Sequence, residues 1–466
     1  MPLKQFTTDF QELTKHQYLR FDEKFWFTTK NLATYDYALL KDIFYLLNGN
    51  SYTEFYTEEK TDIPYVRIGD LSFKHNIDDK NLIYLDESCE INEDKKLRKD
   101  DLILATIGAT IGKINLAREF EGGTFSNNTI LLRLKDKEKH NPYFYEKLFQ
   151  SNLLQKYIWG VVSQKAQPNL QSYDLKNVKI PLVAKSIQDQ IVAQIEPIEK
   201  KIKELKSQIT PPQEIINKVF AREFGFDLEK FEELKKIKNY YLDLFSFGNN
   251  RDIRQSVKFH RKAGVFVNTQ LKKITNKKIK DFISEPIVLG KGVSPKNYDE
   301  NGDYYYISMA NIKNWQFESE DSKLVSKEYS DKNKNKTVAK DDILIARSGE
   351  GTIGKVALIE DENLQGIFAD FTMRIRLQNY NPLFAYYYFR TEYFQYLVEI
   401  NKKGLGNNTN IFPSQIQEFP MIDISSKSQQ KIVDEIKTEL DKQKEMKKKI
   451  EIQRNKIDEI IGKAIS

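Results

Sequence analysis

The stretch KDDLILATIGATIGKINLA begins at Lys99, and a near copy, KDDILIARSGEGTIGKVALI, begins at Lys340, 241 residues later. The flanking segments repeat in the same order. They are YVRIGDL (65–71) and YISMANI (306–312), NPYF (141–144) and NPLF (381–384), PNL (168–170) and TNI (409–411), and SIQDQIVAQI (186–195) and KSQQKIVDEI (427–436). Five ordered matches at nearly one offset indicate that the chain contains two copies of one unit. A two-copy chain is suited to recognising something that has two parts.

The composition favours a protein with several β-rich domains. A chain of 466 residues is too long to fold around a single hydrophobic core, so two to three domains are expected. Phe (29) and Tyr (25) supply much of the 40% hydrophobic content, which favours strands with aromatic packing. The net charge of +6 permits nucleic-acid binding without demonstrating it, because Lys-rich surfaces are common.

Cysteine and histidine are too few for several classes of site. The one cysteine, Cys89, excludes disulfides within the chain and cysteine-based zinc sites. The four histidines lie far apart in the sequence, so a histidine metal cluster is not expected. The first ten residues lack the apolar core of a signal peptide, and no run of about 18 apolar residues occurs. We therefore expect a cytoplasmic chain without membrane contact.

Each copy divides into a strand-rich part and a long charged helix. The strand-rich part, roughly 170 residues, consists of short alternating or apolar runs broken by Gly, Asn, Asp and Pro, with helices starting near Pro142 and Pro382. The helix of copy one has apolar residues at heptad spacing: Ile191, Ile195, Ile198, Ile202, Leu205 and Ile209. The helix of copy two, over 427–464, has a stripe of Val433, Ile436, Leu440, Ile450, Ile457 and Ile461.

Several residues interrupt these helices. Pro197 is expected to kink the first helix or cost it a hydrogen bond, and Pro211-Pro212 to interrupt it. Gln443 and Lys447 occupy expected apolar positions in the second helix.

Residues 222–250 are predicted to form an additional helical connector, which includes LEKFEELKKIKNYYLDLF. Neither stripe can be buried alone, so we expect the helices to pair head to tail as an antiparallel coiled coil. Packing of each helix on its own domain or on another protein is the alternative.

The predicted fold class is α+β, with two β-rich domains of the same fold related by a pseudo-two-fold axis and separated by two long antiparallel helices. The predicted boundaries are 1–185 for the first β-rich domain, 186–249 for the first helical spacer with its connector, 250–425 for the second β-rich domain, and 426–466 for the second spacer.

Two motifs resemble those of enzymes but lack essential residues. GEGTIGKV, from Gly349, has the spacing of a phosphate-binding loop, yet Val356 stands where Ser or Thr is needed, and the following VALI is strand-like. NPYF at Asn141 resembles an amino-methyltransferase motif but lacks its second proline and recurs at Asn381. We interpret the glycine-rich segments as hairpin turns and expect no catalytic residues in the chain.

The duplicated strand–turn–strand, the loops QPNLQSYDLKNVKIPL (167–182) and NTNIFPSQIQEFPM (408–421), and the two helix starts together resemble the specificity subunit of type I restriction–modification enzymes. The resemblance covers nearly the whole chain. It implies two target-recognition domains that each read half of a bipartite, asymmetric site in double-stranded DNA. It also implies that the helices set the spacing and dock two adenine-N6 methyltransferase subunits, with two restriction or translocase subunits as further partners. S-adenosylmethionine, ATP and Mg are expected in those partners, with no cofactor or metal in this chain.

DNA contact requires Lys and Arg for phosphates, and Asn, Gln, Ser or Arg for base edges, presented by loops on a rigid scaffold. Four matched pairs of loops qualify. The candidates are Asn48, Asn50, Ser51, Thr110, Lys113, Asn127, Asn128, Ser163, Gln164, Lys165, Gln167 and Asn169 in copy one, and Lys291, Arg347, Ser348, Lys355, Lys402, Lys403, Asn407, Asn408 and Asn410 in copy two. Ordinary turn residues and solvated lysines are the competing interpretation for each loop.

Positions at which the two copies agree and positions at which they differ are expected to have different roles. Where the copies agree, as in KDD and GK, the residues are expected to serve the fold or docking. Where they differ, as in NNT (127–129) against DFT (370–372), they are expected to set different half-sites. Alternative functions are a specificity subunit of a related fused restriction–methylation system, a free-standing sequence-specific DNA-binding protein, and a nucleotide-binding enzyme built on GEGTIGKV.

Overall fold

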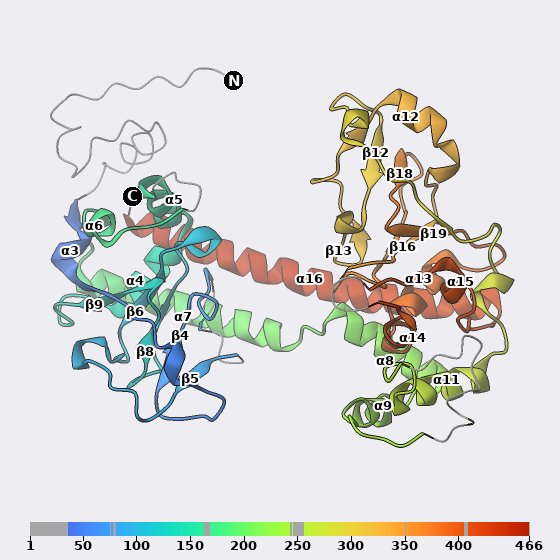
Figure 1. The fold of residues 1–466 in the computed structure, drawn as a ribbon. Helices are drawn as coiled ribbons and strands as arrows, with labels where there is room; N and C mark the ends of the chain where they lie inside the picture. Colours follow the sequence, from blue (N-terminus) through green and yellow to red (C-terminus); the bar gives the residue numbers. More distant parts are fainter. Residues whose placement is uncertain are drawn as a thin grey trace. The chain divides into compact units, whose positions relative to one another are not determined.

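The computed structural model describes residues 36–74, 76–77, 81–162, 168–242, 245, 256–349, 351–404 and 409–465, and it has an α+β fold. The chain forms two compact units. Unit 1 contains the residues up to Gln208 together with Met446–Ser466, and unit 2 contains Ile209–Glu445. Each unit holds one copy of the repeated strands (Figure 1). The predicted α+β class with two domains of one fold is therefore confirmed.

The main sheet of each unit is antiparallel and four-stranded. In unit 1 its spatial order is β2 (Phe44–Asn48), β9 (Thr129–Leu134), β6 (Leu102–Ala105) and β7 (Ile114–Leu116). In unit 2 the order is β11 (Val288–Leu289), β19 (Thr372–Ile375), β16 (Ile343–Ala346) and β17 (Val356–Leu358). The duplicated stretch thus forms the hairpins β6–β7 and β16–β17, as predicted. All four of its strands are almost entirely buried because their runs are continuously apolar.

A second sheet in each unit combines antiparallel and parallel pairs. In unit 1 it contains β3 (Tyr56–Thr57), β5 (Ile83–Leu85), β4 (Pro64–Val66) and β8 (Thr124–Phe125). In unit 2 it contains β15 (Leu324–Val325), β12 (Tyr304–Ile307) and β18 (Gly366–Phe368). The parallel pairs β4–β8 and β12–β18 correspond between the units. Smaller pairs are β1 (Tyr37–Leu39) with β10 (Lys179–Pro181), and β13 (Ile312–Lys313) with β14 (Gln316–Phe317).

The second aspartate of each KDD motif is a buried structural residue. Asp101 binds Arg133 through two hydrogen bonds of 2.9 and 2.7 Å, and Asp342 binds Arg376 through two of 2.7 Å. Both aspartates also accept a backbone N–H three residues earlier, which fixes the turn before the strand. Bidentate pairs of this kind are among the stronger polar contacts in proteins. The agreement of the two copies at this position therefore serves the fold, which is one of the two roles predicted for it.

The NPYF and NPLF motifs begin helices. Asn141 and Asn381 each accept hydrogen bonds from the second and third backbone N–H groups of the following helix, and a proline occupies the first turn of each. The matched helices are α4 (Pro142–Gln150) and α13 (Pro382–Arg390), α5 (Asn152–Val161) and α14 (Glu392–Asn401), and α6 (Ser172–Lys176) and α15 (Pro413–Ile416). The remaining short helices include α3 (Leu40–Ile43), α11 (Lys262–Ile274) and α12 (Lys327–Lys332).

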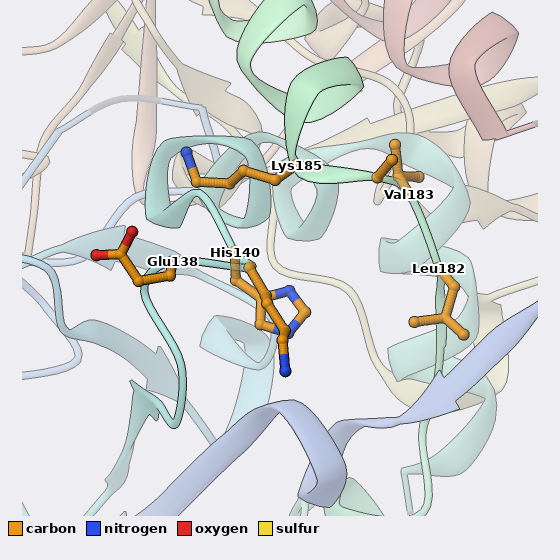
Figure 2. A pocket seen from close by; sticks show the side chains of 7 residues that line it. Glu138, His140, Leu182, Val183 and Lys185 are labelled. Atoms are coloured by element: carbon orange, nitrogen blue, oxygen red, sulfur yellow. The ribbon is translucent and has the colours of Figure 1, made fainter.

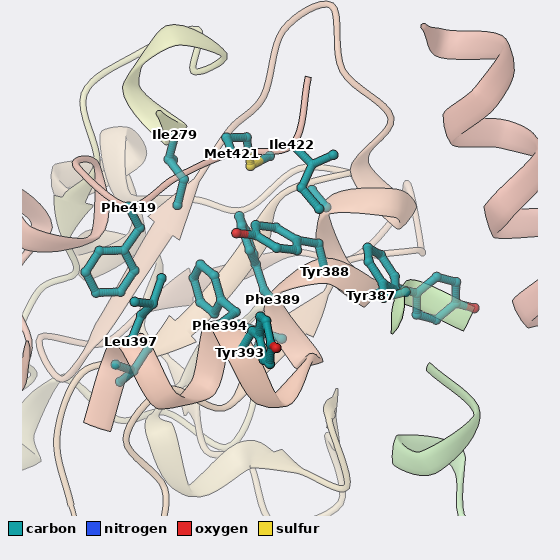
Figure 3. Close-up of a cluster of buried hydrophobic side chains, with 14 of the residues drawn as sticks. Ile279, Tyr387, Tyr388, Phe389, Tyr393, Phe394, Leu397, Phe419, Met421 and Ile422 are labelled. Carbon is teal, nitrogen blue, oxygen red and sulfur yellow. The ribbon is translucent and has the colours of Figure 1, made fainter. Parts of the chain in front are cut away.

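The core of unit 2 is rich in aromatic side chains (Figure 3). Tyr388 and Phe394 are among its fully buried members, and their rings lie 5.5 Å apart in an edge-to-face arrangement. The segment after the first long helix also enters this core. Phe226 stacks on Tyr393 at 4.3 Å, and Phe231 packs edge-on against the same ring. The aromatic composition seen in the sequence is thus used mainly for domain cores.

The predicted helical connector is only partly helical. α8 (Pro212–Phe224) ends at Gly225, which has a left-handed conformation, and Asp227 caps α9 (Leu228–Lys235). The prediction of one helix through LEKFEELKKIKNYYLDLF is wrong for 236–242, where the chain leaves the helix. Leu228, Phe231 and Leu234 of α9 pack in or against the core of unit 2, and the chain leaves the helix after Lys235. Residues 243–244 and 246–255 lie outside the described part of the chain.

The long helices contribute parts of their apolar stripes to the cores of the units. α7 (Lys185–Ser207) remains helical through Pro197, and α16 (Ser426–Ile465) is one uninterrupted helix (Figure 1). In unit 1, Ile191 and Ile195 of α7 share a buried cluster with Ile461 near the end of α16. In unit 2, Phe220 of α8 shares a cluster with Ile436 near the start of α16. The first long helix, α7, thus packs near the end of α16, and α8 packs near the start of α16, which is the order expected for antiparallel helices.

Each domain is contacted by both long helical segments. The start of α7 binds the α4 cap in its own copy, because Gln188 accepts from the Asn141 N–H at 2.7 Å. The end of α16 binds the same domain at α5, where Asp458 accepts from the Asn152 amide at 2.8 Å. In unit 2, Gln429 accepts from the Asn381 N–H at 2.8 Å. Also in unit 2, Asn217 of α8 accepts from the Glu392 N–H at the start of α14, at 3.0 Å.

Gln443 is a buried polar residue at a position where the heptad pattern expects an apolar one. It is 7% exposed, and its side-chain oxygen accepts a 2.9 Å hydrogen bond from the Thr210 N–H, just before α8 begins. Thr210 lies in the interruption between Ser207, where α7 ends, and Pro212, where α8 begins, so its N–H is outside the hydrogen bonding of both helices. Gln443 therefore replaces a hydrogen bond that the interruption removes.

We expect Gln443→Leu to destabilise the protein although it completes the apolar stripe. The substitution leaves the Thr210 N–H without its acceptor, at a cost of about 1–2 kcal/mol. Thermal and urea denaturation measure the change. Lys447→Leu is the matched control, because Lys447 is exposed on the same helix and its replacement is expected to change stability by less than about 0.5 kcal/mol. A rise in stability for Gln443→Leu would contradict this role.

Candidate nucleic-acid interface

Three separated segments meet at one end of the main sheet in unit 1, immediately after β6. The backbone N–H of Thr106 donates to the Asn128 carbonyl at 3.1 Å, and the Thr106 carbonyl accepts from the Leu170 N–H at 2.8 Å. Beside it, Ile107 bridges Asn169 in antiparallel fashion. The backbone of Thr106, the residue after strand β6, is thus fixed through both its N–H and its C=O. These two bonds do not involve its side chain.

Unit 2 repeats this arrangement with different side chains. The Arg347 N–H donates to the Phe371 carbonyl at 3.0 Å, and the Arg347 carbonyl accepts from the Ile411 N–H at 2.9 Å. Ser348 bridges Asn410 as Ile107 bridges Asn169 in unit 1. The predicted loops of each copy therefore converge on one surface at matched positions, which we call the loop surface of each unit.

The first predicted loop joins this surface through a glycine. Gly49 and Gly290 donate to the Thr129 and Thr372 carbonyls at 3.2 and 3.0 Å. A Cβ atom at Gly49 would lie 2.0 Å from the Ser126 carbonyl oxygen, and one at Gly290 would lie 2.0 Å from that of Phe368. Only glycine allows this close approach of two backbones. The NGN and GKG segments thus share one backbone requirement despite their different neighbours.

Buried tyrosines hold the next residue of each loop. The Tyr65 hydroxyl donates to the Asn50 carbonyl at 2.8 Å, and the matched Tyr306 hydroxyl donates to the Lys291 carbonyl at 3.0 Å. Burial raises the pKa of both tyrosines above the ordinary value, and it raises the pKa of Tyr329, a second donor to Lys291, to about 12. These phenols therefore remain protonated donors at physiological pH and keep the loops fixed.

The glycine-rich turns are hairpins, as predicted. Gln155 and Gln395 donate to the Gly112 and Gly354 carbonyls at 2.7 and 2.8 Å, so a glutamine fixes each turn. β17 begins at Val356, directly after the turn, so the helix N-terminus required by a phosphate-binding loop is absent from this place. The Thr110 hydroxyl donates to the Ile107 carbonyl at 2.6 Å and thereby serves the turn, while the side chains of Lys113 and Lys355 are partly exposed.

The loop surface of unit 1 presents mainly amide side chains. Asn48, Ser51 and Asn127 are exposed, and Asn128 and Asn169 are partly exposed. Asn50 is engaged within the unit, because its side chain contacts the Tyr52 hydroxyl and the Lys95 ammonium. Asparagine amides carry both a donor and an acceptor and suit base edges in the major groove.

The loop surface of unit 2 presents cationic and aromatic side chains. Lys291 and Lys403 are exposed, while Arg347 and Asn410 are partly exposed. Lys403 and Asn410 face each other across a short antiparallel bridge with two backbone hydrogen bonds of 2.7 Å. Charge for phosphates and polar groups for bases are thus combined on one face.

Two predicted residues do not belong to this surface. Lys402 is 8% exposed and forms a 2.7 Å ion pair with Glu399, and Ser348 is also 8% exposed, with its hydroxyl donating to the Thr409 carbonyl. Their side chains stabilise unit 2 from within, so we exclude them from the candidate interface. Six further candidates lie outside the described residues, namely Ser163, Gln164, Lys165, Gln167, Asn407 and Asn408.

Sequence reasoning missed residues that the structure brings to the same surface. They are Gln171, which is exposed, and Phe412, its counterpart in the aligned loops of unit 2. Thr106, which the repeat offset gives for Arg347, is only 7% exposed, so its side chain does not belong to this surface. The loop alignment could have indicated Gln171, because it directly follows the PNL match (168–170). Phe412 gives no such signal, since an exposed aromatic residue in a loop cannot be told from a buried one by sequence alone.

A shallow hollow of about 400 Å³ lies in unit 1 where α7 begins (Figure 2). Its lining includes His140 and Lys185, whose polar groups already have partners within the unit. The His140 ring lies 2.9 Å from the Tyr145 hydroxyl, and Lys185 pairs with Asp189 at 2.9 Å. Burial lowers the pKa of His140. The hollow forms where the chain turns into α7, and none of its lining residues belongs to the loop surface.

Comparisons with known proteins agree with the duplicated architecture. A family model described as the type I restriction modification DNA specificity domain matches the chain twice, over residues 34–211 and 271–454. A comparison with curated proteins found no match. No helix among the residues that the structure describes is both long and apolar enough to cross a membrane.

Three solved structures are similar along most of the chain, each at 14% identity. A crystal structure of a type I restriction–modification S subunit from M. genitalium has a TM-score of 0.42 and covers 93% of this chain and 97% of that one. A structure on complex assembly and conformational transition of the type I restriction–modification system has a TM-score of 0.49, covering 92% and 97%. The HsdS subunit from Thermoanaerobacter tengcongensis has a TM-score of 0.32, covering 92% and 96%.

We expect Gly49→Ala and Gly290→Ala to destabilise their own units by about 1–3 kcal/mol each, because the added methyl group collides with backbone. Differential hydrogen exchange of the two units measures where each change acts. Gly69→Ala is the control, since a Cβ atom there meets nothing within 4 Å. Equal protection of both units in both variants would show that the close approach is unimportant.

Proposed function

The chain belongs to the family of type I restriction–modification DNA specificity subunits, and we propose that each of its two domains reads one half of a bipartite, asymmetric DNA site. One observation carries the proposal. The backbones of the two loop surfaces are fixed by the same hydrogen bonds, while Thr106 and Asn128 in unit 1 correspond to Arg347 and Phe371 in unit 2. A shared scaffold with different side chains is what two unlike half-sites require.

In this proposal each loop surface enters a major groove. Exposed lysines, among them Lys291 and Lys403, neutralise phosphates and position the domain, while amide and guanidinium groups read base edges. Contacts of the first kind give salt-dependent affinity that is independent of sequence, and contacts of the second kind give discrimination of about 1–3 kcal/mol for each bidentate pair.

The proposed role of the helices is to set the gap between the half-sites and to dock two adenine-N6 methyltransferase subunits. Those partners would hold S-adenosylmethionine, and restriction or translocase subunits that join them would use ATP and Mg. The chain itself acts without catalysis in this scheme. The exposed, charged faces of α7 and α16 provide surface for such docking, because only their stripes are used for the cores.

Exchanging residues 250–425 for the equivalent domain of another specificity subunit is expected to change one half of the methylated motif and leave the other half unchanged. Genome-wide mapping of methylated adenines, with and without this gene, measures the motif. The reciprocal exchange of residues 36–185 is the matched experiment and is expected to change the other half. Retention of both original half-sites after either exchange would contradict the proposal.

A further inference from the structure

Arg347 lies between two exposed aromatic rings on the loop surface of unit 2. Its guanidinium carbon is 5.8 Å from the centroid of the Phe371 ring and 5.3 Å from that of Phe412. The two rings come from different segments, one after β18 and one after the bridge to Ser348. Both distances fall within the range of cation–π attraction.

The guanidinium is also oriented by a hydrogen bond. Its Nη2 donates to the Asn410 side-chain oxygen at 3.1 Å. Its Nε is enclosed and has no acceptor within the described chain. An arginine has five N–H donors in a rigid fork, so the orientation leaves N–H groups of the terminal nitrogens for a ligand. The side chain is thereby held in one position before a ligand arrives, which lowers the entropy lost on binding.

The two rings that flank Arg347 are exposed to solvent. Phe371 is 45% exposed and Phe412 37% exposed, although other aromatic residues of unit 2 are buried in its core. Aromatic side chains grouped on a surface mark a binding site more often than solvent-facing structure. Here the two rings flank a cation. The site therefore favours a ligand that presents hydrogen-bond acceptors along one edge and has flat or methylated apolar groups beside them.

We propose that Arg347 reads a guanine in the half-site bound by unit 2, with its terminal N–H groups donating to the O6 and N7 acceptors in the major groove. Phe371 and Phe412 keep the guanidinium in place and exclude water from around it, and Asn410 sets its orientation. This inference rests on the proposed function. Arginine to guanine is the pairing in which a fixed fork matches two acceptors on one base.

The first domain has no equivalent cation at the matched positions. Thr106 replaces Arg347, and its hydroxyl donates to the Asn128 carbonyl at 2.9 Å. Asn128 replaces Phe371, and Gln171 occupies the position of Phe412 in the aligned loops. The guanine contact therefore belongs to one half-site only, and it contributes to the asymmetry of the whole site.

A phosphate contact by Arg347 is the alternative, and two substitutions separate it from base reading. Arg347→Lys keeps the charge but loses the fork, whereas Arg347→Gln loses both the charge and the fork but keeps a polar side chain. Each variant is assembled with the methyltransferase subunit of its own system, and the methylated motif is mapped in cells. Binding to duplexes with every base pair at each motif position is then measured over a salt series.

Base reading predicts that both substitutions relax one G·C pair in the half-site assigned to unit 2 by domain exchange. Preference for that pair is expected to fall about 10- to 100-fold, while the salt dependence for Arg347→Lys stays as in the unmodified complex. The first half-site remains unchanged in both variants.

Other results overturn the inference. A uniform loss of affinity in Arg347→Gln, with the salt slope reduced by about one and normal behaviour of Arg347→Lys, indicates a phosphate contact. An unchanged motif in both variants, or loss of the folded state of unit 2 in both by hydrogen exchange, assigns Arg347 a structural role. If the unmodified complex has no sequence preference at all, the proposed function fails, which is distinguishable from failure of the Arg347 assignment alone.

Discussion

The architecture of both units depends on the main-chain hydrogen bonds around the residue that follows the central strand. At Thr106 and at Arg347, the N–H and the C=O are both engaged, by segments that lie far apart in the sequence. Backbone groups are the same for every amino acid, so the bonds impose a position without imposing a side chain. This position therefore accepts unlike side chains, a buried Thr106 in unit 1 and a partly exposed Arg347 in unit 2, while both domains keep one fold.

Much of this scaffold was predictable because it depends on local chemistry. The glycine-rich segments were predicted as hairpin turns, and helices were predicted to start near Pro142 and Pro382; both predictions are confirmed. From the agreement of the copies, KDD was expected to serve the fold or docking, but the partner arginine of its second aspartate, about thirty residues away, could not be identified from spacing. The predicted DNA contacts themselves stay predictions.

The misjudged features depend on contacts between distant segments. Gln443 interrupted an apolar stripe in the sequence, and its purpose appears only beside Thr210, which lies 233 residues away. Lys402 looked like a loop cation, yet Glu399 on the preceding turn of helix pairs with it in a buried place. The connector helix ended earlier than the sequence pattern predicted: α9 stops at Lys235, after Leu228, Phe231 and Leu234 have packed in or against the core. In each case tertiary packing outweighed a local pattern.

The end of α16 completes unit 1, since Asp458 accepts a hydrogen bond from Asn152 of α5 and Ile461 enters the core that Ile191 and Ile195 also line. On the ribosome, that segment emerges after the intervening residues 209–445, a delay of roughly 10–50 s at 5–20 residues per second. During this time the first domain is unfinished, with an apolar strip of α7 open to solvent. Biogenesis of this chain thus favours chaperone occupancy of the first domain, and a nascent chain arrested before α16 would be a target for proteases.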